Sequence, residues 1–121
     1  MKKILIVDDE SSIRSLVKRI LAKTHIVLEA CDGVEAVKVA RTGKPDLILM
    51  DIMMPKMDGY AACSLIKGDP ELTNIPVIMV TALGFQLNKE LATKLGSDGY
   101  VTKPFSPEIL RTTIDQCLGS K

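Results

Sequence analysis

The feature of this sequence that most constrains the fold is an alternation, repeated about five times, of short apolar runs with segments of helical periodicity. Apolar runs this short are typical of buried strands, and a helix between two strands is the usual connection in a parallel sheet. The pattern therefore predicts an α/β protein in which helices cover both faces of one parallel sheet. The predicted strands are Ile4 to Val7, Ile26 to Ala30, Leu47 to Met50, Val77 to Val80 and Gly99 to Thr102.

The segments between these strands carry the periodicity and the end signals of helices. The first helix is marked by apolar residues at the three-and-four spacing of one helical face, Ile13, Leu16, Val17, Ile20 and Leu21. The others are predicted from about Gly33 to Arg41 with an end at Gly43, after Asp58-Gly59, across Leu87, Leu91 and Leu95 to Gly96, and from Ser106-Pro107-Glu108 through Leu110, Ile114, Cys117 and Leu118.

The composition predicts one globular domain over residues 1–121, because 46% of the residues are hydrophobic and no linker divides the chain. The 16 Lys and Arg residues nearly balance the 15 Asp and Glu residues, which argues against nucleic-acid binding through phosphate neutralisation. The apolar run near the N-terminus is too short for a signal peptide or a membrane span, so we expect a cytoplasmic protein. The 3 widely spaced cysteines predict neither disulfides nor a zinc site.

The first predicted strand ends abruptly at three consecutive acids, Asp8, Asp9 and Glu10. Two unit charges about 4 Å apart repel by roughly 4 kcal/mol at an effective dielectric constant near 20, so converging carboxylates usually hold a cation. A hard cation such as Mg²⁺ is the simplest candidate because it prefers oxygen ligands. The alternative is that the acids only favour the N-terminus of the next helix, where Ser11 or Ser12 would be the cap.

Further polar side chains follow the other predicted strands: Asp51 the third, Thr81 the fourth and Lys103 the fifth. The carboxyl ends of parallel strands lie at one edge of the sheet, which is where open α/β sheets bind ligands. Each residue alone has a structural explanation, as a helix cap, a strand residue or a surface charge. Together with Asp8 and Asp9 they form a set of groups suited to phosphoryl transfer.

The chemistry of these groups suggests a role for each. Asp8 and Asp9 can hold Mg²⁺, which reduces the repulsion between an incoming phosphoryl group and the carboxylate of Asp51. Asp51 would then be the nucleophile and would form an aspartyl phosphate. The hydroxyl of Thr81 and the ammonium of Lys103 are available as donors to the phosphoryl oxygens.

Met53 lies two residues after Asp51 and could add its backbone carbonyl to the ligands of Mg²⁺. A soft-metal site at Met53, Met54 and Met57 is disfavoured, because the nearby carboxylates are hard ligands and methionine commonly fills apolar gaps. The apolar side chain of Met53 should position an attacking water poorly. We therefore expect it to prolong the phosphorylated state.

The segments that carry a family resemblance are Val7-Asp8-Asp9-Glu10, Asp51-Ile52-Met53-Met54-Pro55-Lys56-Met57-Asp58-Gly59, Val80-Thr81-Ala82 and Lys103-Pro104-Phe105. In this order, and each at the end of an expected strand, they resemble the motifs of bacterial two-component response-regulator receiver domains, the CheY-like superfamily. The resemblance covers essentially the whole chain. It implies a flavodoxin-like (βα)5 fold, a doubly wound parallel sheet with strand order 2-1-3-4-5.

The same resemblance implies a signalling domain and not an enzyme. Asp51 would accept a phosphoryl group from the phosphohistidine of a sensor histidine kinase or a histidine phosphotransfer protein, with Mg²⁺ bound at Asp8 and Asp9. Thr81 and Lys103 would contact the phosphoryl oxygens. Catalysis by the domain itself would be limited to self-phosphorylation and autodephosphorylation.

The resemblance also implies how phosphorylation is read. Tyr100 would swing inward when Thr81 moves toward the phosphoryl group, which would remodel the surface of the fourth helix, fifth strand and fifth helix for a downstream protein target. The Lys103-Pro104 peptide bond would be cis, which holds for only about 5 to 6% of such bonds in folded proteins.

Two other classes of protein fit the sequence less well. A phosphohydrolase of the haloacid-dehalogenase type would carry a second acid two residues after its nucleophile on the first strand, whereas Asp8 and Asp9 are adjacent. A flavodoxin-like cofactor binder needs amides and hydroxyls after the first strand, and Asp8-Asp9-Glu10 would repel a flavin phosphate. The sequence leaves open whether the chain is a stand-alone regulator or the receiver part of a longer protein.

Overall fold

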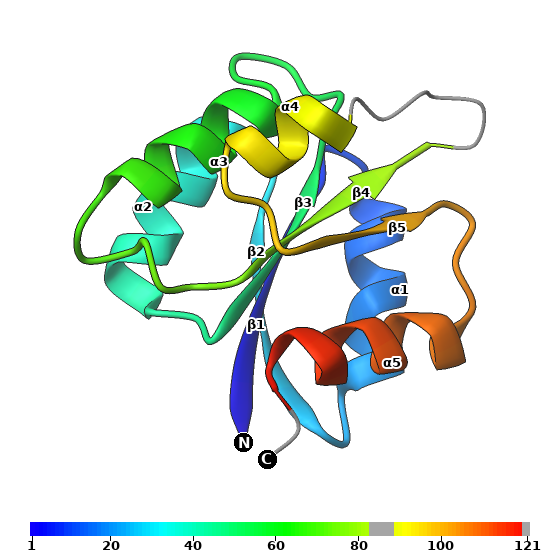
Figure 1. Ribbon diagram of the computed structural model, residues 1–121. Coiled ribbons are helices and arrows are strands. Elements are labelled where there is room, and N and C mark those ends of the chain that lie inside the picture. Colours follow the sequence, from blue (N-terminus) through cyan, green and yellow to red (C-terminus); the bar gives the residue numbers. More distant parts are fainter. Residues whose placement is uncertain (83–88, 120–121) are drawn as a thin grey trace.

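The structure is a computed structural model that describes residues 1–82 and 89–119. In this part of the chain, five parallel strands form one sheet with the order β2-β1-β3-β4-β5 (Figure 1). The expected strand order 2-1-3-4-5 and the flavodoxin-like fold class are therefore confirmed. The strands are β1 (Lys2–Val7), β2 (His25–Ala30), β3 (Leu47–Asp51), β4 (Val77–Thr81) and β5 (Gly99–Thr102).

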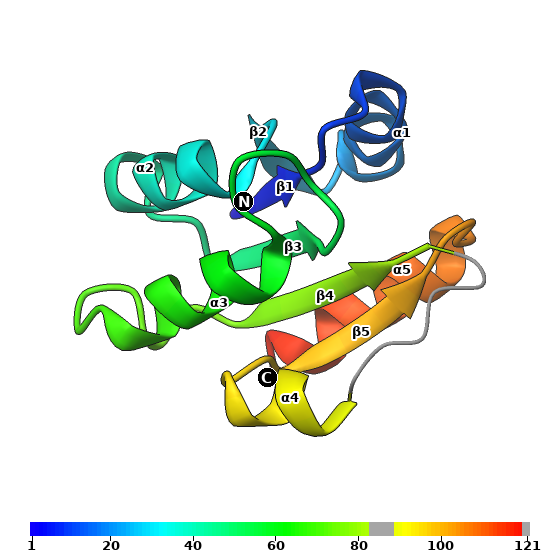
Figure 2. The same ribbon diagram turned by 90° about the horizontal axis from the view of Figure 1, so that it is seen from above.

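The helices of the described residues form a layer on each face of the sheet (Figures 1 and 2). One core cluster joins the sheet to α1 and α5, and the other joins it to α2, α3 and α4. Leu87, predicted within the fourth helix, lies outside the described residues. The helices are α1 (Ser11–Leu21), α2 (Gly33–Gly43), α3 (Gly59–Gly68), α4 (Lys89–Lys94) and α5 (Pro107–Cys117).

The central strands are buried on both faces. Every residue of β3 and β4 is buried, as are Ile4 to Val7 of β1. A strand covered by helices on both sides has no solvent-facing positions, which explains why these runs are continuously apolar and do not alternate. The edge strands β2 and β5 keep exposed positions.

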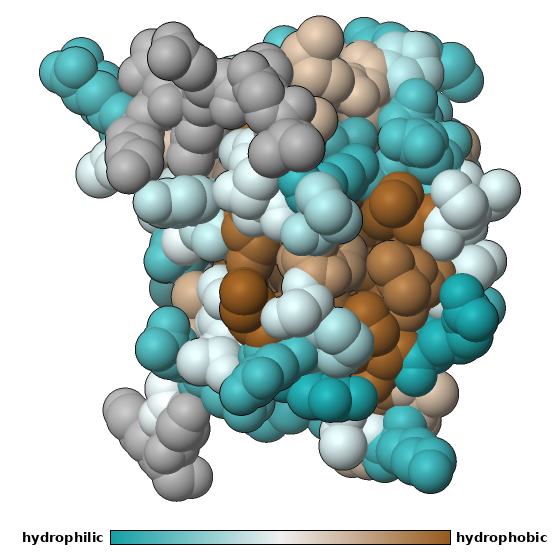
Figure 3. Space-filling view, turned by 90° about the vertical axis from the view of Figure 1, so that its right-hand side faces the viewer, coloured by the Kyte–Doolittle hydropathy of each residue, from teal (hydrophilic) through white to brown (hydrophobic). Residues whose placement is uncertain are grey.

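The layer of α1 and α5 leaves apolar atoms at the surface. Leu16 and Phe105 are partly buried against this core, and Ile109 in the first turn of α5 is 57% exposed. Figure 3 views this side of the molecule and shows apolar patches among polar side chains.

None of the helices in the described residues combines the length and the apolar character that crossing a membrane requires.

Candidate functional site

Asp8 and Asp51 lie at the carboxyl edge of the sheet, on neighbouring strands. Asp8 directly follows β1 and is completely buried, and Asp51 is the last residue of β3 and is 5% exposed. Asp9 and Glu10 extend the group toward solvent, with carboxylate oxygens of Asp8, Asp9 and Glu10 within 4.8 Å of one another. The sequence therefore brings several like charges together at the end of β1.

Lys103 connects these carboxylates across the sheet. Its Nζ lies 2.7 Å from Asp8 Oδ2 and 3.4 Å from Asp51 Oδ1. The backbone N–H of Lys103 donates to the carbonyl of Thr81 at 2.7 Å, and the Lys103-Pro104 peptide bond is cis, the form that the resemblance implies. A single ammonium thus stands between two buried carboxylates. We refer to Asp8, Asp9, Asp51 and Lys103 as the carboxylate site.

The pKa values of the site reflect this crowding. Burial, followed by the negative charge of Asp8, raises the pKa of Asp51 to about 6, although Lys103 acts in the opposite direction. Burial by itself would lower the pKa of Lys103, but its 2.7 Å ion pair with Asp8 and the charges of Asp51 and Asp8 outweigh that effect and raise it. Lys103 is therefore a permanent cation at neutral pH, and burial and the charge of Asp8 disfavour the ionised form of Asp51.

The alternative, in which the acids favour the N-terminus of the next helix, named the wrong cap residue. The N-cap position of α1 is Glu10, no side chain caps it, and Ser11 is already the first helical residue. Instead, Asp8 Oδ1 accepts a hydrogen bond from the backbone N–H of Glu10 at 2.9 Å. In that alternative Ser11 or Ser12 would be the cap, and neither is, because the chain enters the helix one residue earlier.

The donor set fits a hard divalent cation. The acidic side chains that follow β1, Asp8, Asp9 and Glu10, bring together carboxylate oxygens, which Mg²⁺ prefers. Among the described residues, Asp8 Oδ2 is buried and has no hydrogen-bond donor in good geometry, although it forms the ion pair with Lys103. A buried carboxylate oxygen with unused acceptor capacity is suited to a metal ligand.

The other predicted residues lie outside the ion-paired group of Asp8, Asp51 and Lys103. Thr81 Oγ1 is directed toward β5, where it lies 3.4 Å from the carbonyl oxygen of Val101 and 3.4 Å from Thr102 Oγ1. The side chain of Tyr100 is 47% exposed, and that of Met53 is 65% exposed. Asp8, Asp51 and Lys103 are thus assembled, whereas the Thr81 hydroxyl is engaged with β5.

Arg14 is a contributor that the sequence analysis missed. Its Nη1 donates to the backbone carbonyl of Asp8 at 2.6 Å, and its Nε pairs with Glu29 at 3.1 Å. Arg14 therefore ties α1 and β2 to the residue that opens the carboxylate site. Its place in the first turn after the acids was the available signal, but on an amphipathic helix a polar residue of this kind looks like ordinary surface.

The glycine of the third helix also contributes to the site. The N–H of Gly59 donates to the carbonyl of Ile52 at 2.8 Å, and a Cβ at Gly59 would lie 2.2 Å from the carbonyl oxygen of Asp51. Only a residue without a side chain permits α3 to start this close to β3. The sequence analysis assigns Gly59 no role in the site. In the structure, Gly59 allows the close approach of α3 to β3.

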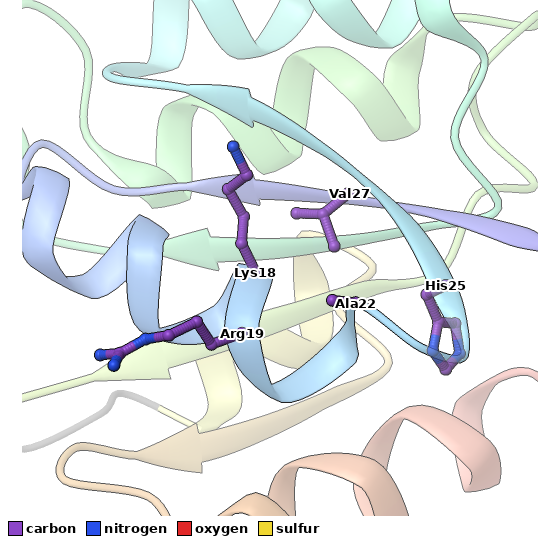
Figure 4. A pocket seen from close by; sticks show the side chains of 5 residues that line it. All are labelled: Lys18, Arg19, Ala22, His25 and Val27. Atoms are coloured by element: carbon purple, nitrogen blue, oxygen red, sulfur yellow. The ribbon is translucent and has the colours of Figure 1, made fainter.

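A separate hollow of about 330 Å³ lies between the end of α1 and the edge strand β2 (Figure 4). Its lining contains neither a carboxylate nor a nucleophilic side chain and consists of Lys18, Arg19, Ala22, His25 and Val27. The carboxylate site is therefore identified by its chemistry and not by the size of a cavity.

Comparison with known proteins assigns this chain to a protein family. A family model described as the response regulator receiver domain matches residues 4–115. The probable transcriptional regulator ycf27 of Guillardia theta is 44% identical over 114 residues, which are 93% of this chain and 44% of that protein. The alkaline phosphatase synthesis transcriptional regulatory protein PhoP of Bacillus subtilis is 42% identical over 118 residues, 97% of this chain and 48% of that protein. The chain spans about half the length of these curated relatives.

Solved structures agree with this assignment. The chemotaxis protein CheY4 of Vibrio cholerae superposes with a TM-score of 0.90 at 32% identity, over 97% of this chain and 98% of that one. The receiver domain of the sensor histidine kinase PA1611 from Pseudomonas aeruginosa, solved with a magnesium ion in its active-site cleft, has a TM-score of 0.88 at 29% identity over 98% of both chains. With a family match over most of its length and this CheY-like fold, the chain belongs to the response regulator receiver domain family.

Proposed function

We propose that Asp51 accepts a phosphoryl group from the phosphohistidine of a sensor histidine kinase or a histidine phosphotransfer protein, in a Mg²⁺-dependent reaction. The observation that carries this proposal is the position of Lys103 Nζ, 2.7 Å from Asp8 Oδ2 and 3.4 Å from Asp51 Oδ1. A fixed ammonium beside a buried carboxylate is already in place to bind the phosphoryl oxygens when that carboxylate is modified.

The transfer uses an ionised oxygen of Asp51. This oxygen forms a bond to phosphorus while the P–N bond of the donor breaks, and the electron pair of that bond stays on the imidazole nitrogen. Because the pKa of Asp51 is raised to about 6, most molecules carry the ionised nucleophile at pH 7 and above. Lys103 keeps its proton and neutralises part of the charge of the aspartyl phosphate.

Asp8, Asp9 and Asp51, with the backbone carbonyl of Met53, would hold the Mg²⁺ ion. When bound, the ion supplies positive charge that offsets the repulsion between a phosphoryl group and the carboxylates. The close carboxylate oxygens of Asp8 and Asp9 and the unused acceptor capacity of Asp8 Oδ2 support the β1 part of this assignment. The magnesium ion in the cleft of the PA1611 receiver domain supports it further.

The response to phosphorylation starts at Thr81. We propose that its hydroxyl leaves Val101 and Thr102 and donates to a phosphoryl oxygen, and that Tyr100 then moves inward. These residues lie on β4 and β5, so the change would reach the surface of α4, β5 and α5. A downstream protein target would read this surface.

The phosphoryl donor is proposed to dock beside the carboxylate site. The α1 helix begins directly after the acids, and the partly exposed apolar residues Leu16, Phe105 and Ile109 lie on the α1 and α5 side.

Residues 1–121 are proposed to form one receiver domain with self-phosphorylation and autodephosphorylation as its only catalysis. The near-neutral charge of +1 supports a domain without nucleic-acid contacts of its own.

The test is intact-mass analysis after incubation with Mg²⁺ and acetyl phosphate. We expect one added phosphoryl group, which is lost in Asp51→Asn and when Mg²⁺ is chelated. Asp46→Asn is the matched control, because Asp46 precedes the same strand at its opposite end, where it accepts a hydrogen bond from the Lys3 N–H. Phosphorylation that persists in Asp51→Asn, or an unmodified wild-type protein, would refute the proposal.

A further inference from the structure

We infer that Asp32, Gly33 and Lys56 position the loop between β3 and α3 for metal binding, by holding residues 52–58 against the N-terminus of α2. The inference rests on the proposed function, because this loop carries the Met53 carbonyl that is assigned to Mg²⁺. None of the three residues belongs to the carboxylate site. They are positioning residues that act through the loop.

Gly33 provides the closest approach between α2 and the loop. Gly33 is buried, and a Cβ at this position would lie 2.7 Å from the carbonyl oxygen of Met57 and 2.9 Å from its Cβ. The Met57 carbonyl oxygen is a backbone atom, and the Met57 Cβ is bonded to the backbone. A change of side-chain rotamer therefore cannot move either atom aside. A side chain at residue 33 must therefore displace the loop itself or the start of α2.

Asp32 and Lys56 add an electrostatic contact to this packing. Asp32 is buried, its Oδ1 accepts the N-cap hydrogen bond from Glu35 at 2.8 Å, and its Oδ2 lies 3.7 Å from Lys56 Nζ. Lys56 has φ = 67°, the left-handed conformation that residues with a side chain rarely adopt. The ion pair holds this strained loop residue toward the start of α2.

A displacement at Met57 must be absorbed in the middle of the loop. Both ends are tied to each other, because the N–H of Gly59 donates to the carbonyl of Ile52 at 2.8 Å. Inside the loop, the N–H of Met57 donates to the carbonyl of Pro55 at 2.7 Å. The residues between Ile52 and Pro55 include Met53, so a shifted loop changes where the Met53 carbonyl lies.

The support on the α2 side is itself anchored next to Asp8. The last residue of β2, Ala30, pairs with Val7 of β1, and the N–H of Asp8 donates to the carbonyl of Ala30 at 3.1 Å. Residues 31–33 follow directly. The contact therefore fixes the loop relative to the strand that presents the metal-binding carboxylates.

The test compares Gly33→Ala with Gly68→Ala by calorimetric titration with Mg²⁺ in the absence of a phosphoryl donor. Gly68 is the matched control, because a Cβ there would meet nothing within 4 Å. We expect Gly33→Ala to raise the dissociation constant for Mg²⁺ about tenfold, as loss of outer-shell support does at metal sites. Gly68→Ala should leave it unchanged.

A second pair of variants keeps the inference testable if Gly33→Ala does not fold. Lys56→Gln should weaken Mg²⁺ binding by about twofold to fivefold, the range of an exposed ion pair, and Lys56→Arg should restore it. Lys44→Gln is the matched control, because Lys44 also has a positive φ, of 46°, and lies at the opposite end of α2. Asp32→Asn keeps a capping side chain and should reproduce the effect of Lys56→Gln.

The outcomes separate this inference from the function on which it rests. A wild-type domain that does not bind Mg²⁺ would count against the proposed metal site. A wild-type domain that binds Mg²⁺ while Gly33→Ala and Lys56→Gln bind it equally well would overturn the inference and leave the proposed function intact. Equal weakening in the Gly68 and Lys44 controls would also overturn it, because the effect would then be general destabilisation.

Discussion

The two halves of the carboxyl edge of the sheet are held in different ways. On β1 and β3, Asp8 is completely buried with its carbonyl bound by Arg14, and Gly59 packs against the carbonyl of Asp51. On β4 and β5, the Thr81 hydroxyl has contacts of 3.4 Å, and Tyr100 is 47% exposed. Asp8 is thus held by short contacts before a phosphoryl group arrives, whereas the buried Thr81 hydroxyl is held only by two long ones.

Lys103 joins the two halves, so Lys103→Ala should have the largest effect. Removing a donor aimed at developing charge costs on the order of 100-fold in rate, and we expect phosphorylation by acetyl phosphate to slow by about that factor. Rates come from mass spectrometry over time. Lys94→Ala, at the end of α4, serves as the control and should be normal. A normal rate in Lys103→Ala would mean that the halves act independently.

Asp51→Asn tests, through the free energy of unfolding, how strongly burial and Asp8 disfavour the charge of Asp51 in the half formed by β1 and β3. A carboxyl group with a raised folded pKa binds more protons when folded, so wild-type stability is lost as pH rises from about 4 through about 6. At pH 7 we expect Asp51→Asn to be more stable by about 1 to 3 kcal/mol, and the difference should shrink below pH 4. Urea unfolding at several pH values measures it. A variant that is less stable at pH 7 would contradict the burial argument.

Thr81→Val tests the half formed by β4 and β5. It preserves the branched shape but removes the hydroxyl, and a hydrogen bond to a charged group contributes enough to predict a loss of about tenfold in phosphorylation rate. Thr102→Val removes the other hydroxyl of the 3.4 Å contact and should leave the rate unchanged. If both variants slow the reaction equally, the hydroxyl of Thr81 acts through β5 and not on the phosphoryl group.

Met53→Asn should have the smallest effect. Its side chain is 65% exposed beside the site, and an amide there can orient an attacking water where a thioether cannot. We expect the aspartyl phosphate to be lost about twofold to tenfold faster, the scale of a modest gain in positioning. Met53→Leu should retain the wild-type lifetime. Unchanged or slower loss in Met53→Asn would refute the expectation.

The sequence allowed the sheet and its edge to be predicted in detail. Continuous apolar runs marked β1, β3 and β4, because burial on both faces leaves no polar position in such strands. Boundaries shifted by one or two residues, with β1 starting at Lys2 and β3 and β4 including Asp51 and Thr81. Polar residues at strand ends pointed to a single site, since parallel strands share one carboxyl edge.

The order of the elements and the residues at one sheet edge could be read from the sequence, because periodicity is local and helical crossovers make consecutive strands parallel. Only the tertiary structure decided that Lys103 stands between Asp8 and Asp51, that Thr81 faces β5, and that Gly33 receives the loop at Met57. These contacts join residues far apart in the chain. Their distances depend on how whole helices and strands pack, which no local pattern records.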